Sequence, residues 1–254
     1  MPDDKELLRI DAESMFVLSP SGRIECVNDP GRSIAPRMFI AGCAQGNLAY
    51  VRAEVDDDAA AKLLRLTADE PPWRDPWTLP RCIGELLDVL SSAPPFAIGP
   101  ASRTPLVVSP SLIWHLPNHV QYDHPARIVR GDLAEGAQLV ARFSKAGMPP
   151  EMIEAGFVSV ADLWEPWCLA FEGEEVAASA IAARLSERVA EIGVYTFPKF
   201  RARGYGAAVT AAWSSLASLD GRALFYSTSR TNRSSQRVTA RLGLPMIGAS
   251  VSIG

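Results

Sequence analysis

The stretch EIGVYTFPKFRARGYGAAVTAAWSSLASL, residues 191–219, decides the fold. A strand-like run reaches Pro198, and a turn with two arginines and two glycines follows it. The next residues have the spacing of an amphipathic helix, with apolar side chains at positions 209, 212, 213 and 216. A strand, a glycine turn and a helix aim the unpaired amides of the first helical turn at an anion. The sequence therefore predicts a site for a phosphate-bearing ligand.

The turn between strand and helix supplies both room and positive charge. Gly204 and Gly206 permit positive φ and the close approach of a ligand. Arg201 and Arg203 add guanidinium groups, which pair well with phosphate oxygens. A solvated loop would also explain the arginines, but their position beside the glycines favours an anion site.

Two other phosphate-binding motifs share this outline. A Walker A loop needs a lysine after its glycines, and none follows Gly206. A dinucleotide-binding turn needs a third glycine where Val209 stands, and an acidic residue about 20 positions later, after a second strand. Here Asp220 ends the helix instead. Nucleotide hydrolysis and NAD binding are therefore disfavoured.

The turn resembles the pyrophosphate loop of the GNAT superfamily of N-acetyltransferases. The signature Arg/Gln-x-x-Gly-x-Gly/Ala is filled in order by Arg201, Gly204 and Gly206. Upstream, Glu191 in the context AEIGVY stands where many family members carry the carboxylate that deprotonates the amine. Two separate matches on one continuous segment make the resemblance stronger than a glycine motif alone.

A later segment adds to the resemblance, which covers the chain from about Ala126 onward. NRSSQRVTARLGL, residues 232–244, resembles the family motif Asn-x-x-Ala-x-x-Leu-Tyr-x-x-x-Gly-Phe. Thr239 occupies the position at which the family often places a tyrosine acid. The predicted order of elements is similar to the GNAT fold, in which an antiparallel meander enters the glycine turn and helices alternate with strands after it.

The resemblance implies an N-acyltransferase with acetyl-CoA as donor and a small-molecule or peptide amine as acceptor. It implies that Glu191 is the base and that a backbone N–H of Val194 or Tyr195 binds the thioester oxygen. The proton donor stays open between Tyr195, Tyr226, a water molecule and no acid, because Thr239 is a weak acid. The implied cofactor-binding residues are Val194, Thr196, Arg201, Arg203, Gly204, Tyr205, Gly206, Ala207, Asn232 and Ser235.

Structural roles would explain several of these residues as well. Glu191 could pair with an arginine such as Arg188, and Asn232 could serve only as a helix cap. The apolar face around Trp213 is expected to be core packing. A non-catalytic CoA-binding or regulatory module is a second class of function, which Thr239 and the unassigned N-terminal half favour.

The sequence predicts an α/β (α+β) fold with a mixed, mostly antiparallel sheet flanked by helices. Residues 119–254 are predicted to form the GNAT-like domain, in which Asp132 caps a helix. Residues 1–118 are predicted to form an accessory α/β domain, either a degenerate copy of the same fold or an unrelated one.

Prolines and glycines interrupt the N-terminal half. Pro30, Gly31 and Pro36 predict a loop-rich stretch, and Pro94 and Pro95 are predicted to end a helix. The predicted helices cover residues 5–15, 56–66 and 79–90, and the predicted strands cover residues 48–55 and 106–108. Residues 110–125 show little periodicity and contain His115, His119 and His124, which we expect at a surface or interface rather than on a metal.

Composition and charge limit the classes of protein to which the chain can belong. The 254 residues, 48% of them hydrophobic, can build one large domain or two smaller ones. A net charge of −4 gives no electrostatic case for nucleic acid or anionic membranes, and no apolar run approaches the roughly 20 residues that cross a bilayer. Four widely spaced cysteines and an N-terminus without a signal peptide favour the cytoplasm, with no metal. The edge of the GNAT-like sheet could be covered by the N-terminal half or by a second subunit, and a second subunit would make a homodimer.

Overall fold

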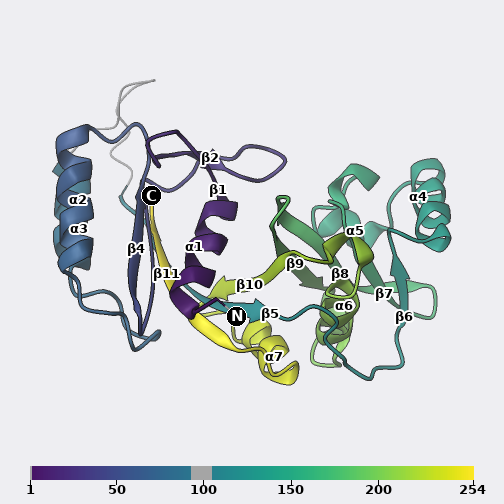
Figure 1. Ribbon diagram of the computed structural model, residues 1–254. Helices are drawn as coiled ribbons and strands as arrows, with labels where there is room; N and C mark the ends of the chain where they lie inside the picture. Colours follow the sequence, from purple (N-terminus) through teal and green to yellow (C-terminus); the bar gives the residue numbers. More distant parts are fainter. Residues whose placement is uncertain (1, 93–104) are drawn as a thin grey trace. The chain divides into compact units, whose positions relative to one another are not determined.

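The computed structural model describes residues 2–92 and 105–254 (Figure 1). Within these ranges the chain forms seven α-helices and eleven strands, and the predicted α/β fold with a mostly antiparallel sheet is confirmed. The chain divides into two compact units. The first unit comprises Met1–Trp114, Ser227–Asn232 and Met246–Gly254, and the second comprises His115–Tyr226 and Arg233–Pro245. The last strand thus belongs to the first unit, although the boundary predicted at residues 118/119 assigned it to the second.

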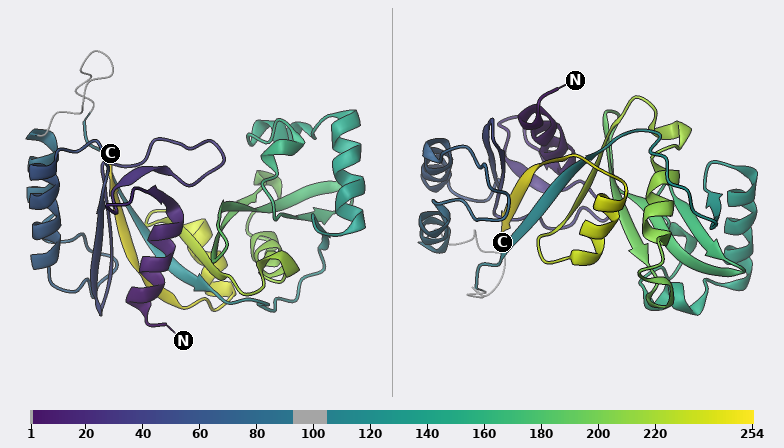
Figure 2. Two further views of the ribbon diagram at one scale, coloured as in Figure 1. Left: turned by 45° about the horizontal axis from the view of Figure 1, so that its top comes forward. Right: turned by 90° about the horizontal axis from the view of Figure 1, so that it is seen from below.

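The first unit is a four-stranded antiparallel sheet with helices on both faces. Its strands lie in the order β4 (Gly46–Val51), β3 (Met38–Cys43), β11 (Met246–Ile253) and β5 (Val108–Leu116). Helix α1 (Asp4–Met15) lies on one face, and α2 (Asp57–Asp69) and α3 (Ile83–Ser92) lie on the other (Figure 2). Leu8 of α1 approaches Gly248, and Trp73 approaches Gly42 on the opposite face.

Several predictions for the N-terminal half were wrong. Strands β1 (Phe16–Leu18), β2 (Ile24–Val27) and β3 were not predicted, and β5 continues to Leu116 through residues that show little periodicity. The loop-rich stretch around Pro30, Gly31 and Pro36 is confirmed, since residues 28–37 form no helix or strand. All six residues of β3 are buried, so its sequence is a continuous apolar run without the alternation that marks a half-buried strand. Helix α3 begins at Ile83 rather than residue 79, and Pro94 and Pro95 lie outside the described residues.

The second unit contains the predicted meander. Its strands lie in the order β10 (Ala223–Ser229), β9 (Val189–Thr196), β8 (Glu175–Leu185), β7 (Cys168–Glu172) and β6 (Arg127–Arg130). Strand β9 runs antiparallel to β8 and parallel to β10. The sheet is therefore mixed at the strand that leads into the glycine turn.

The helices of the second unit agree with the sequence except at one cap. They are α4 (Ala134–Ala146), α5 (Pro150–Glu154), α6 (Tyr205–Trp213) and α7 (Arg233–Arg241). Helix α6 packs against β7, β8 and β9, and Trp213 at its end is fully buried, as expected for core packing. The prediction that Asp132 caps α4 was wrong, because its carboxylate binds Arg130 and Leu133 takes the cap position.

Candidate active site

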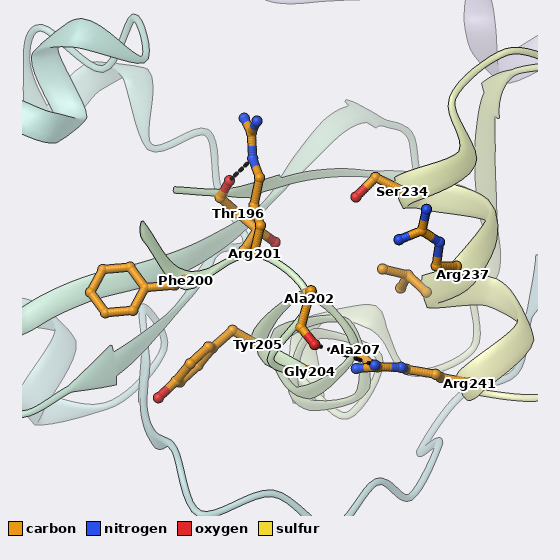
Figure 3. A pocket seen from close by; sticks show the side chains of 12 residues that line it. Thr196, Phe200, Arg201, Ala202, Gly204, Tyr205, Ala207, Ser234, Arg237 and Arg241 are labelled. Carbon is orange, nitrogen blue, oxygen red and sulfur yellow. Dashed lines mark hydrogen bonds between the residues drawn. The ribbon is translucent and has the colours of Figure 1, made fainter. Parts of the chain in front are cut away.

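A pocket lies between the N-terminal turn of α6 and helix α7 (Figure 3). Six of the predicted cofactor-binding residues line it, namely Thr196, Arg201, Gly204, Tyr205, Gly206 and Ala207. Helix α7 contributes Ser234, Arg237 and Arg241, which were not predicted, and Val238, which lies in the later motif. The pocket thus joins the strand end, the glycine turn and the later helix, all within the second unit.

The N-terminus of α6 presents backbone amides to this pocket. Gly204 is the N-cap, with φ of 96°, and its carbonyl accepts a hydrogen bond from Ala208 N–H at 3.0 Å. No side chain of the described residues caps this helix. The amides of Tyr205, Gly206 and Ala207 come before the first helical hydrogen bond, so they point out of the helix end. Such an end attracts an anion through its donors and its dipole.

Gly206 is required by close packing on the inner side of the turn. A Cβ at this position would lie 2.9 Å from Thr196 Oγ1 and 3.2 Å from Val238 Cγ2. The absence of a side chain therefore lets α6 approach both β9 and α7. The second glycine of the motif thus allows β9, α6 and α7 to pack closely around the pocket.

Three arginines make the pocket positive. Arg201 donates from Nε to Thr196 O at 3.2 Å, and Arg241 donates from Nη2 to Ala202 O at 3.4 Å. Figure 3 shows Arg201 on one side of the pocket and Arg237 on the other, with Arg237 projecting from α7. None of the lining residues in the described chain is acidic. The arrangement suits a ligand with more than one phosphate, since guanidinium groups bind phosphate oxygens strongly.

Arg203 points away from the pocket. Its Nη2 lies 2.5 Å from Glu172 Oε2, and its guanidinium lies over the Tyr205 ring, 5.4 Å from the centroid. The Tyr205 hydroxyl donates to the same carboxylate oxygen at 2.5 Å. These hydrogen bonds, first from Tyr205 and then from Arg203, hold the pKa of Glu172 below its usual range. The phosphate-binding role of Arg203 stays a prediction, and its side chain does not line the pocket.

Strand β9 separates from β10 beside the pocket. The parallel pairing between them joins Val189–Glu191 to Ala223–Phe225, as Ala223↔Val189, Leu224↔Ala190 and Phe225↔Glu191. Strand β9 continues to Thr196, whereas the pairing with β10 in the described chain ends at Glu191. An exposed strand edge of this kind offers backbone donors and acceptors to an extended ligand arm.

The hydrogen bonds of β9 decide which amides face this edge. Phe197 N–H donates to Ala177 O of the neighbouring segment at 3.1 Å. Because amide directions alternate along an antiparallel strand, Tyr195 N–H also points toward β8. The amides of Val194 and Thr196 point away from β8. Of the two predicted thioester-oxygen donors, the strand geometry thus favours Val194.

Glu191 lies where the two strands separate and is almost fully buried. Its side chain is 3% exposed and forms an ion pair with Arg184 on β8, so an arginine partner is confirmed. Arg184 keeps a quarter of its side chain exposed. The ion pair gives Glu191 a structural role, and its role as the catalytic base stays a prediction.

The candidate proton donors occupy different environments. Thr239 is buried, and its hydroxyl donates to Gln236 O at 2.9 Å within its own helix. Tyr226 is also buried, and burial raises the pKa of its phenol despite a hydrogen bond with Ser235. The Tyr195 ring packs edge-on against Phe197, with centroids 5.1 Å apart.

Two predicted cofactor-binding residues of the later motif lie outside the pocket lining. Ser235 bonds Tyr226 rather than facing the pocket. Asn232 is exposed and directly precedes α7, and its N–H donates to Ser229 O at 2.9 Å. Their binding roles stay predictions. The lining arginines of α7 could have been found from the sequence, since Arg237 and Arg241 lie four residues apart on one predicted helix.

The remaining features concern metals, thiols and membranes. Over residues 2–92 and 105–254 no cluster of three His, Cys, Asp or Glu side chains is arranged to hold a metal ion. The four cysteines are free, and burial raises the pKa of Cys82 and of Cys168 to about 12. Within the described part of the chain, no helix has the length and apolar character needed to cross a membrane.

Comparison with solved structures gives low-identity matches. The chain is similar to GNAT-family N-acetyltransferases. An acetyltransferase of that family from Colwellia psychrerythraea is 15% identical, with 68% of this chain and 72% of that chain covered and a TM-score of 0.43. A GCN5-related N-acetyltransferase from Sphaerobacter thermophilus is 12% identical, with 98% and 84% covered and a TM-score of 0.39.

A further structure covers less of both chains. A GCN5-related N-acetyltransferase from Kribbella flavida is 16% identical, with 59% of this chain and 59% of that chain covered and a TM-score of 0.39. No protein-family model matches the sequence, and no curated protein matches it. Because the TM-scores are below 0.5, the function proposed below rests on the pocket rather than on these likenesses.

Proposed function

We propose that this chain is an acyl-CoA-dependent N-acyltransferase that moves an acetyl group from acetyl-CoA to a primary amine by direct attack. The observation that carries the proposal is the pocket at the N-terminus of α6, where open amides meet three arginines. The acceptor is proposed to be a small-molecule or peptide amine.

The residues present fit a CoA ester. The amides of Tyr205, Gly206 and Ala207 would hold the diphosphate, with Arg201 and Arg237 beside it. The edge amides of β9 would bind the extended pantetheine arm, as another strand would. When bound, acetyl-CoA would supply an acyl group activated as a thioester.

The residues near the point where β9 and β10 separate would then stabilise negative charge and transfer protons during the reaction. Val194 N–H would donate to the thioester oxygen, which gains negative charge in the transition state. A free alkylammonium has a pKa of about 10.4, so the acceptor must lose a proton before it attacks. Glu191 is the proposed base, and Tyr195 or Tyr226 is the proposed proton donor to the leaving thiolate.

Ligand binding followed by turnover tests the proposal. Acetyl-CoA and CoA are expected to raise the melting temperature of the purified protein, because a ligand that binds only the folded state stabilises it. NAD at the same concentration is expected to leave the melting temperature unchanged. Thiol release from acetyl-CoA is then screened over a panel of amines. Equal stabilisation by NAD, or none by CoA, would contradict the proposal.

A non-catalytic CoA-binding module is the second candidate. Two observations favour it: the Thr239 hydroxyl is bonded within its own helix, and Glu191 is paired with Arg184. This candidate predicts that CoA binds while no amine in the panel releases thiol. The enzyme proposal predicts release with at least one amine and its loss on Glu191→Gln.

A further inference from the structure

The segment between β5 and β6 is tied to the C-terminal end of α6 and to the short helical turn after it, Ala217–Leu219. Asn118 Nδ2 donates to Leu219 O at 3.3 Å. His119 N–H donates to Ser214 O at 3.0 Å, and Val120 N–H donates to Ser214 Oγ at 3.1 Å. These bonds fix the start of a strap, residues 118–126, which belongs with α6 to the second unit.

The other end of the strap reaches the phosphate turn through His124. Its Nδ1 accepts a hydrogen bond from Ala126 N–H at 3.2 Å, so in the neutral ring the proton sits on Nε2. Nε2 lies 3.0 Å from Arg203 O and therefore donates to it. The imidazole also packs edge-on against the Tyr205 ring, with centroids 4.7 Å apart.

The strap is in close contact with the N-cap of α6. A Cβ on Gly204 would lie 3.0 Å from His124 Cδ2 and 3.0 Å from Tyr122 Oη. His124 thus contacts the residues on both sides of the N-cap and packs against the N-cap itself. The strap and the glycine turn fit each other at this point.

The hydrogen bond from His124 to Arg203 O also fixes the direction of a backbone amide at the anion site. The carbonyl of Arg203 and the N–H of Gly204 belong to the same planar trans peptide, so they point in opposite directions. Holding the carbonyl toward His124 therefore turns Gly204 N–H away from the strap. Gly204 lines the pocket, and its amide precedes those of the first helical turn.

We propose that His124 is a positioning residue for the phosphate site, which it orders through the Arg203 carbonyl. This inference rests on the proposed CoA-binding function of the same pocket. His124 does not contact the ligand: its hydrogen bond fixes the peptide plane that begins the row of amides. A free turn would have to be ordered by the ligand, and that cost would weaken binding.

Two substitutions of His124 test the roles of its two ring nitrogens separately. Glutamine places an N–H donor near the position of Nε2, so His124→Gln keeps the bond to Arg203 O. Asparagine places an oxygen near the position of Nδ1, so His124→Asn keeps the bond from Ala126 N–H and loses the other. His119→Asn is a matched control, since His119 Nε2 contacts Asp220 at the far end of the strap, at 3.3 Å.

The test is calorimetric titration of each variant with CoA, with the melting temperature measured alongside. His124→Asn is expected to raise the Kd about three- to tenfold, the effect of one neutral hydrogen bond. His124→Gln and His119→Asn are expected to stay within about twofold of the wild-type Kd. The Gly204 amide resonance of the ligand-free protein is expected to move in the Asn variant and to keep its place in the Gln variant.

The outcomes distinguish the inference from the function on which it rests. Wild-type protein that does not bind CoA would refute the proposed function. Wild-type protein that binds CoA, with a His124→Asn variant of equal affinity, would overturn only the positioning role. Equal weakening by Asn and Gln would also overturn it, because the bond to Arg203 would then not be the cause.

Discussion

Gly206 of α6 and Thr196 of β9 face each other so closely that a Cβ on Gly206 would lie 2.9 Å from Thr196 Oγ1. The same Cβ would lie 3.2 Å from Val238 on α7. Gly206→Ala is therefore expected to push apart the elements that line the pocket. We expect at least a tenfold rise in the Kd for CoA, measured by titration calorimetry.

Gly84→Ala is the matched control for this substitution. Gly84 also lies in the first turn of a helix, α3, and a Cβ there would meet no atom within 4 Å. Alanine is about 1 kcal/mol better than glycine in a helix, so this variant should be as stable as the wild type or slightly more so. Its CoA affinity should be unchanged. An unchanged affinity in Gly206→Ala as well would contradict the proposed pocket.

The arginines of α7 are expected to contribute to phosphate binding. Arg237→Gln and Arg241→Gln should each weaken CoA binding about tenfold or more, because each removes a charge-assisted contact of about 1.5–3 kcal/mol. Both should also reduce the dependence of the Kd on salt. Arg233→Gln is the control on the same helix, since Arg233 Nη1 bonds Gln236 at 3.1 Å and does not line the pocket. An equal loss of CoA affinity in Arg233→Gln would mean that the overall positive charge of α7, and not contact of Arg237 and Arg241 with the ligand, determines binding.

Glu191→Gln separates turnover from binding. The amide keeps a hydrogen-bond acceptor near Arg184 but cannot take a proton, so turnover should fall about 100-fold or more, as for loss of a general base. The Kd for CoA should stay within about twofold, measured by calorimetry beside steady-state thiol release. Glu187→Gln, at an exposed position in the turn before β9, should change neither quantity. Full turnover in Glu191→Gln would exclude it as the base.

Tyr226 is one of the two tyrosines proposed as the proton donor. Because burial raises the pKa of its phenol, the group stays protonated through neutral and mildly alkaline pH. Tyr226→Phe should therefore lower turnover at pH 7 and leave CoA affinity unchanged. Tyr50→Phe is a control in the first unit, at a half-buried phenol whose pKa is raised by burial to about 12. Unchanged turnover in Tyr226→Phe would leave Tyr195, water or no acid as the alternatives.

The hydrogen-bonded group of Glu172, Tyr205 and Arg203 predicts how the stability of the folded protein depends on pH. The pKa of Glu172 is lowered in the folded protein by hydrogen bonds from Tyr205 and Arg203. A carboxyl with a lowered folded pKa stabilises the fold above its unfolded pKa, near 4.5, and loses that effect as the pH falls through the folded value. The stability advantage of the wild type over Glu172→Gln should be present at pH 7 and be lost progressively as the pH falls below 4.5.

Thermal unfolding across that pH range measures this difference. Glu174→Gln is the control, because the Glu174 side chain is 86% exposed and its nearest cation, Arg142, is 4.0 Å away. It should show little difference at any pH. A Glu172→Gln difference that is independent of pH would mean that the cluster does not act through charge.

The second unit could be predicted well from the sequence because its signals are local. The periodicity around Trp213, the glycines of the turn and the strand pattern of the meander each depend on neighbouring residues alone. The N-terminal half was harder, since Met38–Cys43 is buried on both faces and shows no alternation. The pairing of β11 with β3 and β5 joins distant segments, and no local pattern indicates it.

The same distinction applies to the candidate site. The loop residues were predicted from a motif, but the direction of the Arg203 side chain depends on Glu172, which lies on another strand. The pairing of Glu191 with Arg184 likewise follows from the strand register. The contact of His124 with Arg203 joins residues 79 positions apart, so spacing in the sequence could not reveal it.

The most direct test of the proposed phosphate site is a titration of ¹⁵N-labelled protein with CoA, followed at the backbone amides. We expect the largest shifts at Gly204, Tyr205, Gly206 and Ala207, because their N–H groups would donate to the diphosphate. The amides around Gly84 should not move. Saturation by CoA with no shift at the glycine turn would contradict the account.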